Sequence, residues 1–217
     1  MANKQTVLYI DAGHGGLDPM TKEYLTPEKI GKKTLHTNGK AYHNNGWFYE
    51  GHFNRQIAKK FIEEAKKAGF HCVPVYHPWQ DNSLSDRTDT ANAMNQKFGT
   101  RSLFLSFHAN AAGVGTAPQT GAEGVCSFVY KLGTETANLA LSVTQNLEKV
   151  FDKYGSKRRA SLVLDNPLHI TTATKMPAIL LELGFFDSAN NADLLINPTF
   201  RDELVKVMIE TLKTKLA

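Results

Sequence analysis

Short apolar runs alternate with longer stretches of helical periodicity along this chain, and this alternation limits its possible folds more than any other feature. Strands that alternate with helices form a parallel or mixed sheet covered by helices. We therefore predict the α/β class, as a single three-layer domain with a twisted, mostly parallel or mixed sheet of about six strands flanked by helices. The expected strands are Thr6–Ile10, Phe70–Tyr76, Leu103–Phe107, Gly124–Tyr130, Ser161–Leu164 and Ala178–Leu183.

The stretches between these runs carry signals typical of helices. In one of them, Ile57, Phe61 and Ala65 recur at helical spacing, and Gly69 follows as a stop signal. The last stretch begins just after Pro198, a residue that is common at helix starts. The expected helices are His52–Ala68, Ser83–Phe98, Thr134–Tyr154, Ser188–Leu195 and Thr199–Lys215.

Length and composition indicate one domain with an ordinary packed core. The chain has 217 residues, of which 41% are hydrophobic, so it can fold without a disulfide or a structural metal. Cys72 and Cys126 lack metal-ligand spacing, and we interpret them as small buried hydrophobic residues. The net charge of +4 comes without a long basic run, which favours a solvated surface over an anionic partner. Because the fold does not require a structural metal, any bound metal would serve the chemistry of a site.

The segment Leu17–Tyr49 differs from the rest of the chain because it is rich in turn signals and has little periodicity. We expect a long inserted loop at residues 17–49, either a lid that faces a substrate or a surface excursion. A second loop, Ala111–Ala122, is rich in glycine, alanine, threonine and proline.

Three polar residues stand where predicted strands end. His14 follows the first strand, His108 follows the third, and Glu182 lies at the end of the last one. The carboxyl ends of parallel strands converge on the ligand crevice of an open α/β sheet, so these side chains can meet, and Glu50 can join them. Two imidazoles and one carboxylate form a common catalytic zinc set. By spacing alone the signal is weak, since a lone histidine is usually structural and no local metal motif occurs.

Nucleotide binding is not supported, because neither a dinucleotide fingerprint nor a phosphate-binding loop occurs. Glu182 is the most informative of the polar residues. It is flanked by Ile179-Leu180-Leu181 and by Leu183, and burying a carboxylate among such residues is costly unless it has a partner or a purpose.

Five sequence blocks follow one another along the chain. They are Asp11-Ala12-Gly13-His14-Gly15-Gly16, Glu50-Gly51-His52-Phe53-Asn54, Leu84-Ser85-Asp86-Arg87-Thr88 with Ala91-Asn92, Ser106-Phe107-His108-Ala109-Asn110, and Pro177-Ala178-Ile179-Leu180-Leu181-Glu182-Leu183-Gly184-Phe185. Taken in this order, the blocks closely resemble the zinc-dependent N-acetylmuramoyl-L-alanine amidases. These are bacterial cell-wall hydrolases that also supply catalytic domains to phage endolysins. The resemblance runs from about Val7 to the last helix.

The resemblance implies roles for individual residues. His14, Glu50 and His108 match the ligands of one Zn²⁺ ion per chain, and Glu182 matches the catalytic glutamate. His52 is the main rival to Glu50 as a ligand, since it lies only two residues further along the chain.

Other positions are expected to act around this set. Arg87 and Asn92 match positions that look architectural. Asp11 and Asn110 are candidates for orienting the adjacent histidines, because metal-bound imidazoles usually donate their second N–H to an acceptor; an ordinary loop hydrogen bond explains either equally well.

Two segments depart from the family pattern. The insertion at 17–49 is longer than typical, and Ser161–Ile170 replaces a stretch expected to carry more glycine. His169 in that second segment is a candidate for substrate contact, although packing or a surface position is favoured.

By resemblance, the reaction is hydrolysis of the amide between N-acetylmuramic acid and L-alanine of the stem peptide, with a zinc-activated water and with Glu182 as general base and then general acid. Two alternatives remain: a zinc peptidase that cuts within the stem peptide, and a non-catalytic wall-binding module.

The implied partner is peptidoglycan or a muropeptide, with no nucleic acid, no membrane and a monomeric chain. We expect no separate wall-binding domain within residues 1–217 and no signal peptide or transmembrane segment. Action on the bacterial cell wall, in the periplasm or outside the cell, then implies export by a phage lysis route or excision from a larger exported protein.

Overall fold

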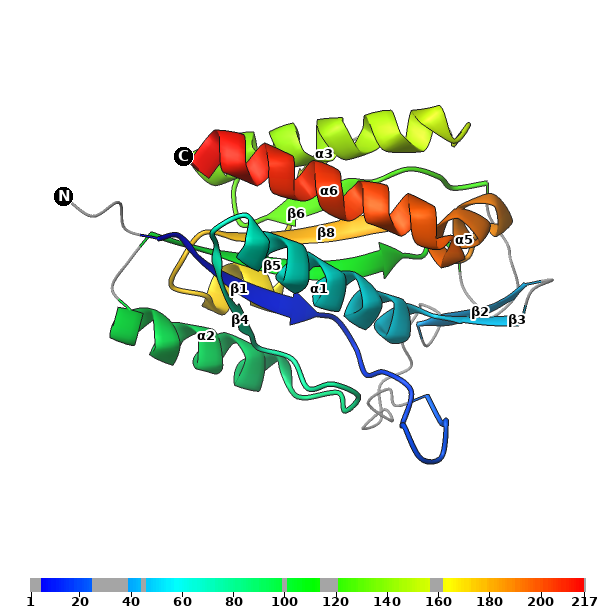
Figure 1. The fold of residues 1–217 in the computed structure, drawn as a ribbon, viewed down its shortest axis with the longest axis horizontal. Coiled ribbons are helices and arrows are strands. Elements are labelled where there is room, and N and C mark those ends of the chain that lie inside the picture. The colour runs from blue at the N-terminus through cyan, green and yellow to red at the C-terminus, as the bar shows by residue number, and fades with distance from the viewer. Residues whose placement is uncertain are drawn as a thin grey trace.

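A mixed six-stranded sheet forms the centre of the molecule (Figure 1). The computed structural model describes residues 5–24, 39–43, 46–98, 101–113, 121–156 and 162–216. Across the sheet the strand order is β4-β1-β5-β8-β6-β7. The strands are β1 (Val7–Ala12), β4 (His71–Pro74), β5 (Ser102–Asn110), β6 (Cys126–Val129), β7 (Val163–Asp165) and β8 (Ala178–Phe185). All six expected strands are present, and the predicted fold class is confirmed.

Strand direction brings the ends of three neighbouring strands together. β4, β1, β5 and β8 run parallel, whereas β6 is antiparallel to β8 and parallel to β7. The carboxyl ends of β1, β5 and β8 therefore share one edge of the sheet, as ligand crevices of α/β sheets require. In the β5–β8 ladder, His108 pairs directly with Glu182.

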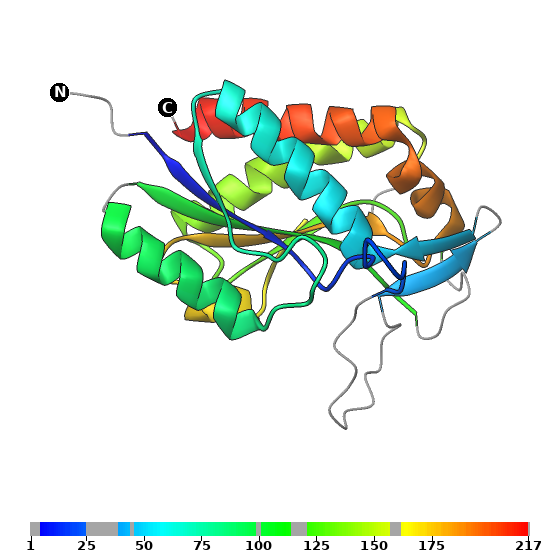
Figure 2. The same ribbon diagram turned by 60° about the horizontal axis from the view of Figure 1, so that its bottom comes forward.

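Helices cover both faces of the sheet, which gives the three expected layers (Figures 1 and 2). One face carries α1 (Glu50–Lys67), α3 (Glu135–Lys153), α5 (Ala189–Ile196) and α6 (Pro198–Leu216), and the other carries α2 (Leu84–Phe98) and α4 (His169–Ala173). Within the described parts of the chain, no helix has both the length and the apolar character needed to cross a membrane.

Each face of the sheet has its own buried cluster, and β1 contributes to both by alternation. Leu8 and Ile10 belong to the larger cluster, beneath α1, α3 and α6, while Val7 and Tyr9 belong to the smaller one, with residues of α2 and α4. Because side chains alternate along a strand, Asp11 shares the face of Val7 and Tyr9 and points towards α2. Cys72 and Cys126 are free and buried, as expected.

Helix boundaries agree with the sequence signals to within two residues, with one omission. Gly69 adopts a φ of +94° after α1, which is the left-handed conformation that favours glycine at a helix end. Ser83 and Asp86 hydrogen-bond reciprocally at the start of α2, since each backbone N–H meets the other side chain. The short helix α4 was not expected, because five residues are too few to show a periodic pattern.

The segment expected to be one long loop contains a small hairpin. Lys40–His43 (β2) and Gly46–Tyr49 (β3) pair as antiparallel strands, so the expectation of an irregular loop is wrong for this part. Four-residue strands with only one packed face leave too short an alternation to stand out in a sequence. Residues 25–38 of the expected insertion and 114–120 of the second expected loop lie outside the described residues.

Candidate metal centre and active site

Three side chains from distant parts of the sequence meet at the shared edge of the sheet. Glu50 lies between the two imidazoles, with its Oε2 3.2 Å from Nε2 of His14 and its Oε1 3.0 Å from Nδ1 of His108. One ligand atom from each of the three residues lies within 4.8 Å of the others. Two imidazole nitrogens and one carboxylate oxygen at this separation are a donor set that can hold a divalent metal ion.

His14 is held in a constrained backbone conformation by close packing around the loop that follows β1. Its φ is +60°, which is unusual for a residue other than glycine. The adjacent Gly13 lies directly against the His108 ring, since a Cβ atom at Gly13 would fall 2.0 Å from Cε1 of that ring. Gly51 is equally tight, because its Cβ would meet the carbonyl oxygen of Gly15 at 1.8 Å. Glycine at both positions therefore lets the loop and α1 approach closely.

Glu50 occupies the first turn of α1, where the helix dipole favours a carboxylate. Its backbone N–H donates to the carbonyl of Gly39 at 2.7 Å, just before β2. Its side chain receives the backbone N–H of Ala109 at 3.3 Å, and Asn54, one turn further along α1, donates its amide both to Glu50 at 3.5 Å and to the Gly13 carbonyl at 3.1 Å. These contacts fix the carboxylate between the two histidines.

In this cluster, the charged form of Glu50 and the protonated form of His14 stabilise each other. Burial alone would raise the pKa of Glu50, but the neighbouring His14 and His108 lower it well below its ordinary value. Burial alone would lower the pKa of His14, yet Glu50 raises it to about 9. Glu50 is therefore ionised at neutral pH and available as an anionic ligand.

Glu182 lies beside this cluster on the neighbouring strand. Its Oε2 atom is buried and has no hydrogen-bond partner among the described residues. Burial raises the pKa of its carboxyl to about 7, with Glu50 adding to the increase and the two histidines opposing it. A carboxyl that titrates near neutral pH is suited to take up and release a proton. Cys126, opposite Glu182 in the sheet, is no competing nucleophile, since burial raises the pKa of its thiol to about 12.

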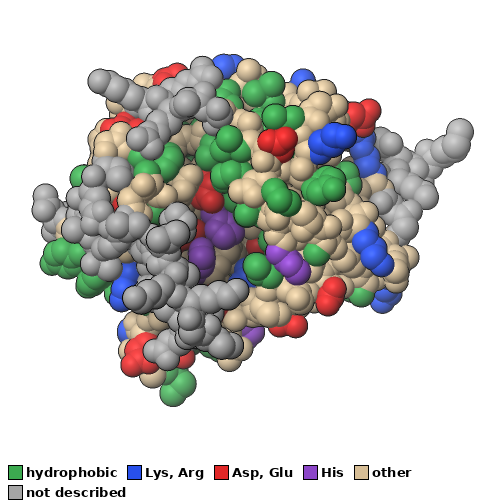
Figure 3. All heavy atoms as spheres, turned by 180° about the vertical axis from the view of Figure 1, so that it is seen from behind, with side chains coloured by type: hydrophobic (Ala, Val, Ile, Leu, Met, Phe, Trp, Pro, Cys, Tyr) green, Lys and Arg blue, Asp and Glu red, His purple; other side chains and the backbone are tan. Residues whose placement is uncertain are grey.

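The space-filling view shows histidine and acidic side chains gathered in a hollow on one face of the molecule (Figure 3). His14 is partly accessible, with 37% of its side chain exposed, whereas the side chain of Glu50 is buried. The cluster is therefore accessible from one side, while the carboxylate of the candidate ligand Glu50 stays shielded from water.

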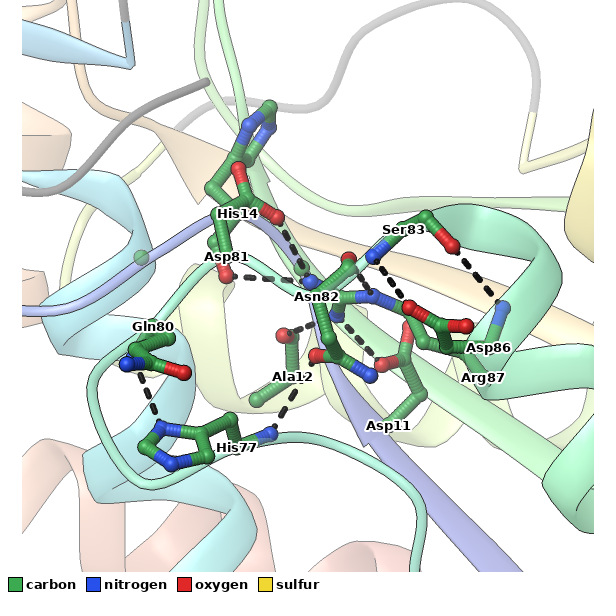
Figure 4. Close-up of polar contacts among 12 residues, drawn as sticks. Asp11, Ala12, His14, His77, Gln80, Asp81, Asn82, Ser83, Asp86 and Arg87 are labelled. Carbon is green, nitrogen blue, oxygen red and sulfur yellow. Dashed lines mark hydrogen bonds and ion pairs between the residues drawn. The ribbon is translucent and has the colours of Figure 1, made fainter.

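Arg87 holds the loop of His14 in place through hydrogen bonds to its backbone (Figure 4). Only 1% of this side chain is exposed, and its guanidinium donates to the carbonyl oxygens of Ala12 at 2.6 Å and His14 at 3.2 Å. It also forms ion pairs with Asp11 at 2.6 Å and Asp81 at 2.8 Å. The rigid fork of a guanidinium can satisfy this many acceptors at once, whereas a lysine ammonium cannot. The architectural role expected for Arg87 is therefore one of holding the backbone of a candidate ligand.

A second arginine, which the sequence did not single out, supports the same loop. Arg55 of α1 donates to Gly51 at 2.9 Å and to Gly13 at 3.4 Å, and it also contacts the carbonyls of His77 at 3.0 Å and Gln80 at 2.9 Å. Its position five residues after Glu50, on a helix whose inner face is apolar, was the only available signal. Arg55 thus ties α1 to two loops at the edge of the site.

Within the described part of the chain, Asp11 and Asn110 contact groups other than the imidazoles of His14 and His108. Asp11 gives its carboxylate to Arg87 and to Ser106, at 2.6 Å each, so its effect on the loop passes through Arg87 rather than through the His14 ring. Asn110 accepts the N–H of Ala111 at 2.8 Å, which is the ordinary loop hydrogen bond considered as an alternative.

His52, the rival ligand, points elsewhere on α1. Its Nε2 lies 2.9 Å from the side-chain amide of Gln56, and it is not part of the cluster formed by the described residues. His169 is exposed on α4 and contacts Thr88 at 3.3 Å. Asn92 donates to the carbonyl of Ala173 at 2.9 Å, an architectural contact between α2 and the end of α4.

Replacing Gly13 with alanine should disrupt the cluster, because the added Cβ must displace the His108 ring or the loop. We expect the affinity for a divalent metal to fall by about 10–100-fold, as for other changes just outside a ligand set. Competition with a chromogenic chelator measures this affinity. Gly121→Ala is the matched control, since its Cβ meets nothing within 4 Å. Equal affinities of the two variants would contradict the packing argument.

Replacing Arg87 with leucine should destabilise the fold, since it leaves the buried carboxylate of Asp11 without its cation. Breaking a buried ion pair from one side costs about 3–5 kcal/mol in the free energy of unfolding. Urea denaturation measures this loss. Arg101→Leu, which removes an exposed arginine, should change stability by no more than about 0.5 kcal/mol. A similar small effect at Arg87 would show that its contacts are not important for stability.

Comparison with known proteins identifies the family of this chain. Residues 8–214 match the profile of the N-acetylmuramoyl-L-alanine amidase family. Over 93% of this chain, 26% of residues are identical to those of an uncharacterized Bacillus subtilis (strain 168) protein, and the match covers 81% of that protein. A sporulation-specific N-acetylmuramoyl-L-alanine amidase of the same organism is 26% identical over 92% of the chain, which spans 64% of that relative's length.

A solved structure gives independent support for the fold. The N-acetylmuramoyl-L-alanine amidase from Clostridium difficile 630 superposes with a TM-score of 0.73 at 24% identity, and the match covers 98% of this chain and 97% of the other. The family match over residues 8–214 confirms the resemblance inferred from the five sequence blocks. The match over nearly the whole chain shows that this protein belongs to the N-acetylmuramoyl-L-alanine amidase family, and thus to the peptidoglycan hydrolases.

Proposed function

We propose that this chain is a zinc-dependent hydrolase that cleaves the amide between N-acetylmuramic acid and L-alanine of the stem peptide in bacterial peptidoglycan. The observation that carries the proposal is the cluster of His14, Glu50 and His108 beside the unpaired carboxylate of Glu182. Family membership supports both the substrate and the enzyme class. The protein would act at the cell wall, where that substrate lies.

The residues present fit a catalytic zinc ion. His14, Glu50 and His108 would be the ligands, and a set of three protein ligands leaves the open position that catalytic zinc sites keep. The low pKa of Glu50 supplies the anionic ligand, whereas the orphaned Oε2 of Glu182 remains free for another task. When bound, zinc would lower the pKa of a water molecule and polarise the scissile carbonyl.

The protein's own residues account for the proton transfers. Glu182 would accept a proton from the attacking water; this role is supported by its Oε2, which has no partner among the described residues, and by a carboxyl that titrates near neutral pH. The same carboxyl then gives that proton to the leaving amine of L-alanine, so the carboxylate is regenerated. Two other residues have positioning roles and do not transfer protons. Arg87 holds the loop of His14, and Asn54 holds the carboxylate of Glu50.

Two other functions can be told apart by their products. A zinc peptidase acting within the stem peptide would leave L-alanine attached to the glycan, and a non-catalytic wall-binding module would release nothing. The buried Oε2 of Glu182, without a partner in the described part of the chain, favours an enzyme over a binding module, since a binder gains nothing from leaving a polar atom buried in this way.

Digestion of purified peptidoglycan should release stem peptides with a free L-alanine amine and leave the glycan intact, as mass spectrometry can detect. A chelator should abolish this release, and added Zn²⁺ should restore it. Glu50→Ala should lose bound metal, whereas His52→Ala should retain it, because only Glu50 contacts both histidines. Peptides cut at any other bond, or release that resists the chelator, would refute the proposal.

Replacing Glu182 with glutamine should preserve metal binding but slow peptide release by at least about a hundredfold, the usual scale of general acid–base catalysis. Metal analysis and a rate assay on the same preparation separate the two effects. Glu210→Gln is the control, since this glutamate is 62% exposed on α6. If the Glu182 variant keeps its activity, the residue does not transfer protons.

A further inference from the structure

The inner face of the β2–β3 hairpin is packed firmly against the body of the protein. Ala41 and Phe48 are buried, and the Phe48 ring stacks on Phe186 with the ring centroids 5.9 Å apart and the planes only 4° from parallel. The Nε2 atom of buried His43 lies 2.7 Å from the carbonyl oxygen of Phe186. Side chains alternate along strands, so the other side chains of the hairpin are held on its outer face.

The outer face carries aromatic rings in place of the polar residues that a solvent-facing strand usually has. Tyr42 is 54% exposed and Trp47 is 44% exposed. Their centroids are 5.3 Å apart, Trp47 stacks on Tyr49 at 6.3 Å, and Tyr49 meets Tyr24 at 4.8 Å. These four residues form a continuous line of ring contacts, which we call the aromatic row.

The inner end of the aromatic row lies next to the candidate metal centre. Tyr49 directly precedes Glu50, and the hydroxyl of Tyr24 accepts the backbone N–H of Gly51 at 3.0 Å. Figures 1 and 2 both show the hairpin extending away from the body at the N-terminal end of α1, which is where Glu50 lies. The aromatic row therefore begins beside the candidate ligands and leads outward along the hairpin.

The chemistry of the aromatic row suits a sugar polymer. The C–H groups on the flat side of a pyranose ring carry partial positive charge and stack on the negative face of an aromatic ring. The tyrosine hydroxyls and the indole N–H can hydrogen-bond to sugar hydroxyl and acetamide groups. The ammonium of Lys40, 4.9 Å from the centre of the Trp47 ring, adds a hydrogen-bond donor on the same face.

The position of the bond to be cut indicates which part of the substrate lies at the aromatic row. Under the proposed function, on which this inference rests, the amide to be cut is attached to an N-acetylmuramic acid ring, so the glycan must pass beside the metal centre. Among the described residues, the outer face offers three aromatic rings and a single cation, so it is better suited to stacking on sugar rings than to pairing with the several carboxylates of a stem peptide. We propose that the aromatic row of the β2–β3 hairpin is a subsite that binds the glycan strand of peptidoglycan by ring stacking.

The first experiment measures binding without cleavage. In the full chain with Glu182→Gln, binding is measured to peptide-free oligosaccharides of alternating N-acetylglucosamine and N-acetylmuramic acid. Trp47→Ala should weaken this binding roughly tenfold, by analogy with the loss of one stacked aromatic ring elsewhere. Tyr42→Ala should weaken it in the same direction, and Trp47→Phe should restore much of it. Both alanine changes remove exposed side chains, and thermal unfolding of each variant checks that the fold is kept.

Tyr130→Ala is the matched control, because this tyrosine is 64% exposed and lies after β6, outside the aromatic row. It should bind the oligosaccharides as the parent does. The proposal is overturned if the parent does not bind them, if Trp47→Ala binds as tightly as the parent, if the control loses as much as Trp47→Ala, or if only free stem peptides bind at the aromatic row.

A second measurement uses the active chain and separates this inference from the proposed function. For Trp47→Ala, the KM for polymeric peptidoglycan should rise more than the KM for a soluble muramyl dipeptide. An unchanged ratio of the two KM values would refute a glycan subsite even if cleavage were normal. Failure of the unsubstituted chain to cleave either substrate would instead refute the proposed function, and the oligosaccharide binding would still test the subsite.

Discussion

The buried guanidinium of Arg87 connects the parts of the structure on which the candidate site depends. It joins α2 to the end of β1 through Asp11 and to the loop of His14 through two carbonyl oxygens. A buried cation is costly unless its hydrogen bonds and its counter-charge are all supplied, and here they are. Without it, the carbonyls of a loop with a left-handed His14 would need other donors, and the position of the imidazole relative to β5 would no longer be fixed.

The requirement that buried charges be paired also explains the cluster of His14, Glu50 and His108. Glu50 is an anion that is shielded from water, and its charge is balanced by the two histidines that the metal would also use. Glu182, on the neighbouring strand β8, has no ion-pair partner within the described part of the chain, and burial outweighs the opposing effect of the two histidines and raises the pKa of its carboxyl. Two buried carboxyls in one site thus have opposite pKa shifts, and this difference separates the candidate ligand from the candidate proton carrier.

Much of the fold followed from the sequence, because short apolar runs and capped amphipathic stretches are local signals. The exceptions have physical reasons as well. Helix α1 begins at Glu50 rather than at His52, since its first turn is fixed by the carbonyl of Gly39, which lies far outside the helical pattern. The hairpin and α4 were missed because four- and five-residue elements show too little periodicity.

The sequence by itself determined the succession of strands and helices along the chain, the family, and the residue types of the site, because local patterns and motifs carry each of these. Tertiary structure alone brings Glu50, and not His52, into contact with the two histidines, since residues two apart on a helix point to different sides and the packing of α1 selects one. It alone also revealed the supporting role of Arg55 and the aromatic row, because both depend on contacts between residues that are separate in the sequence.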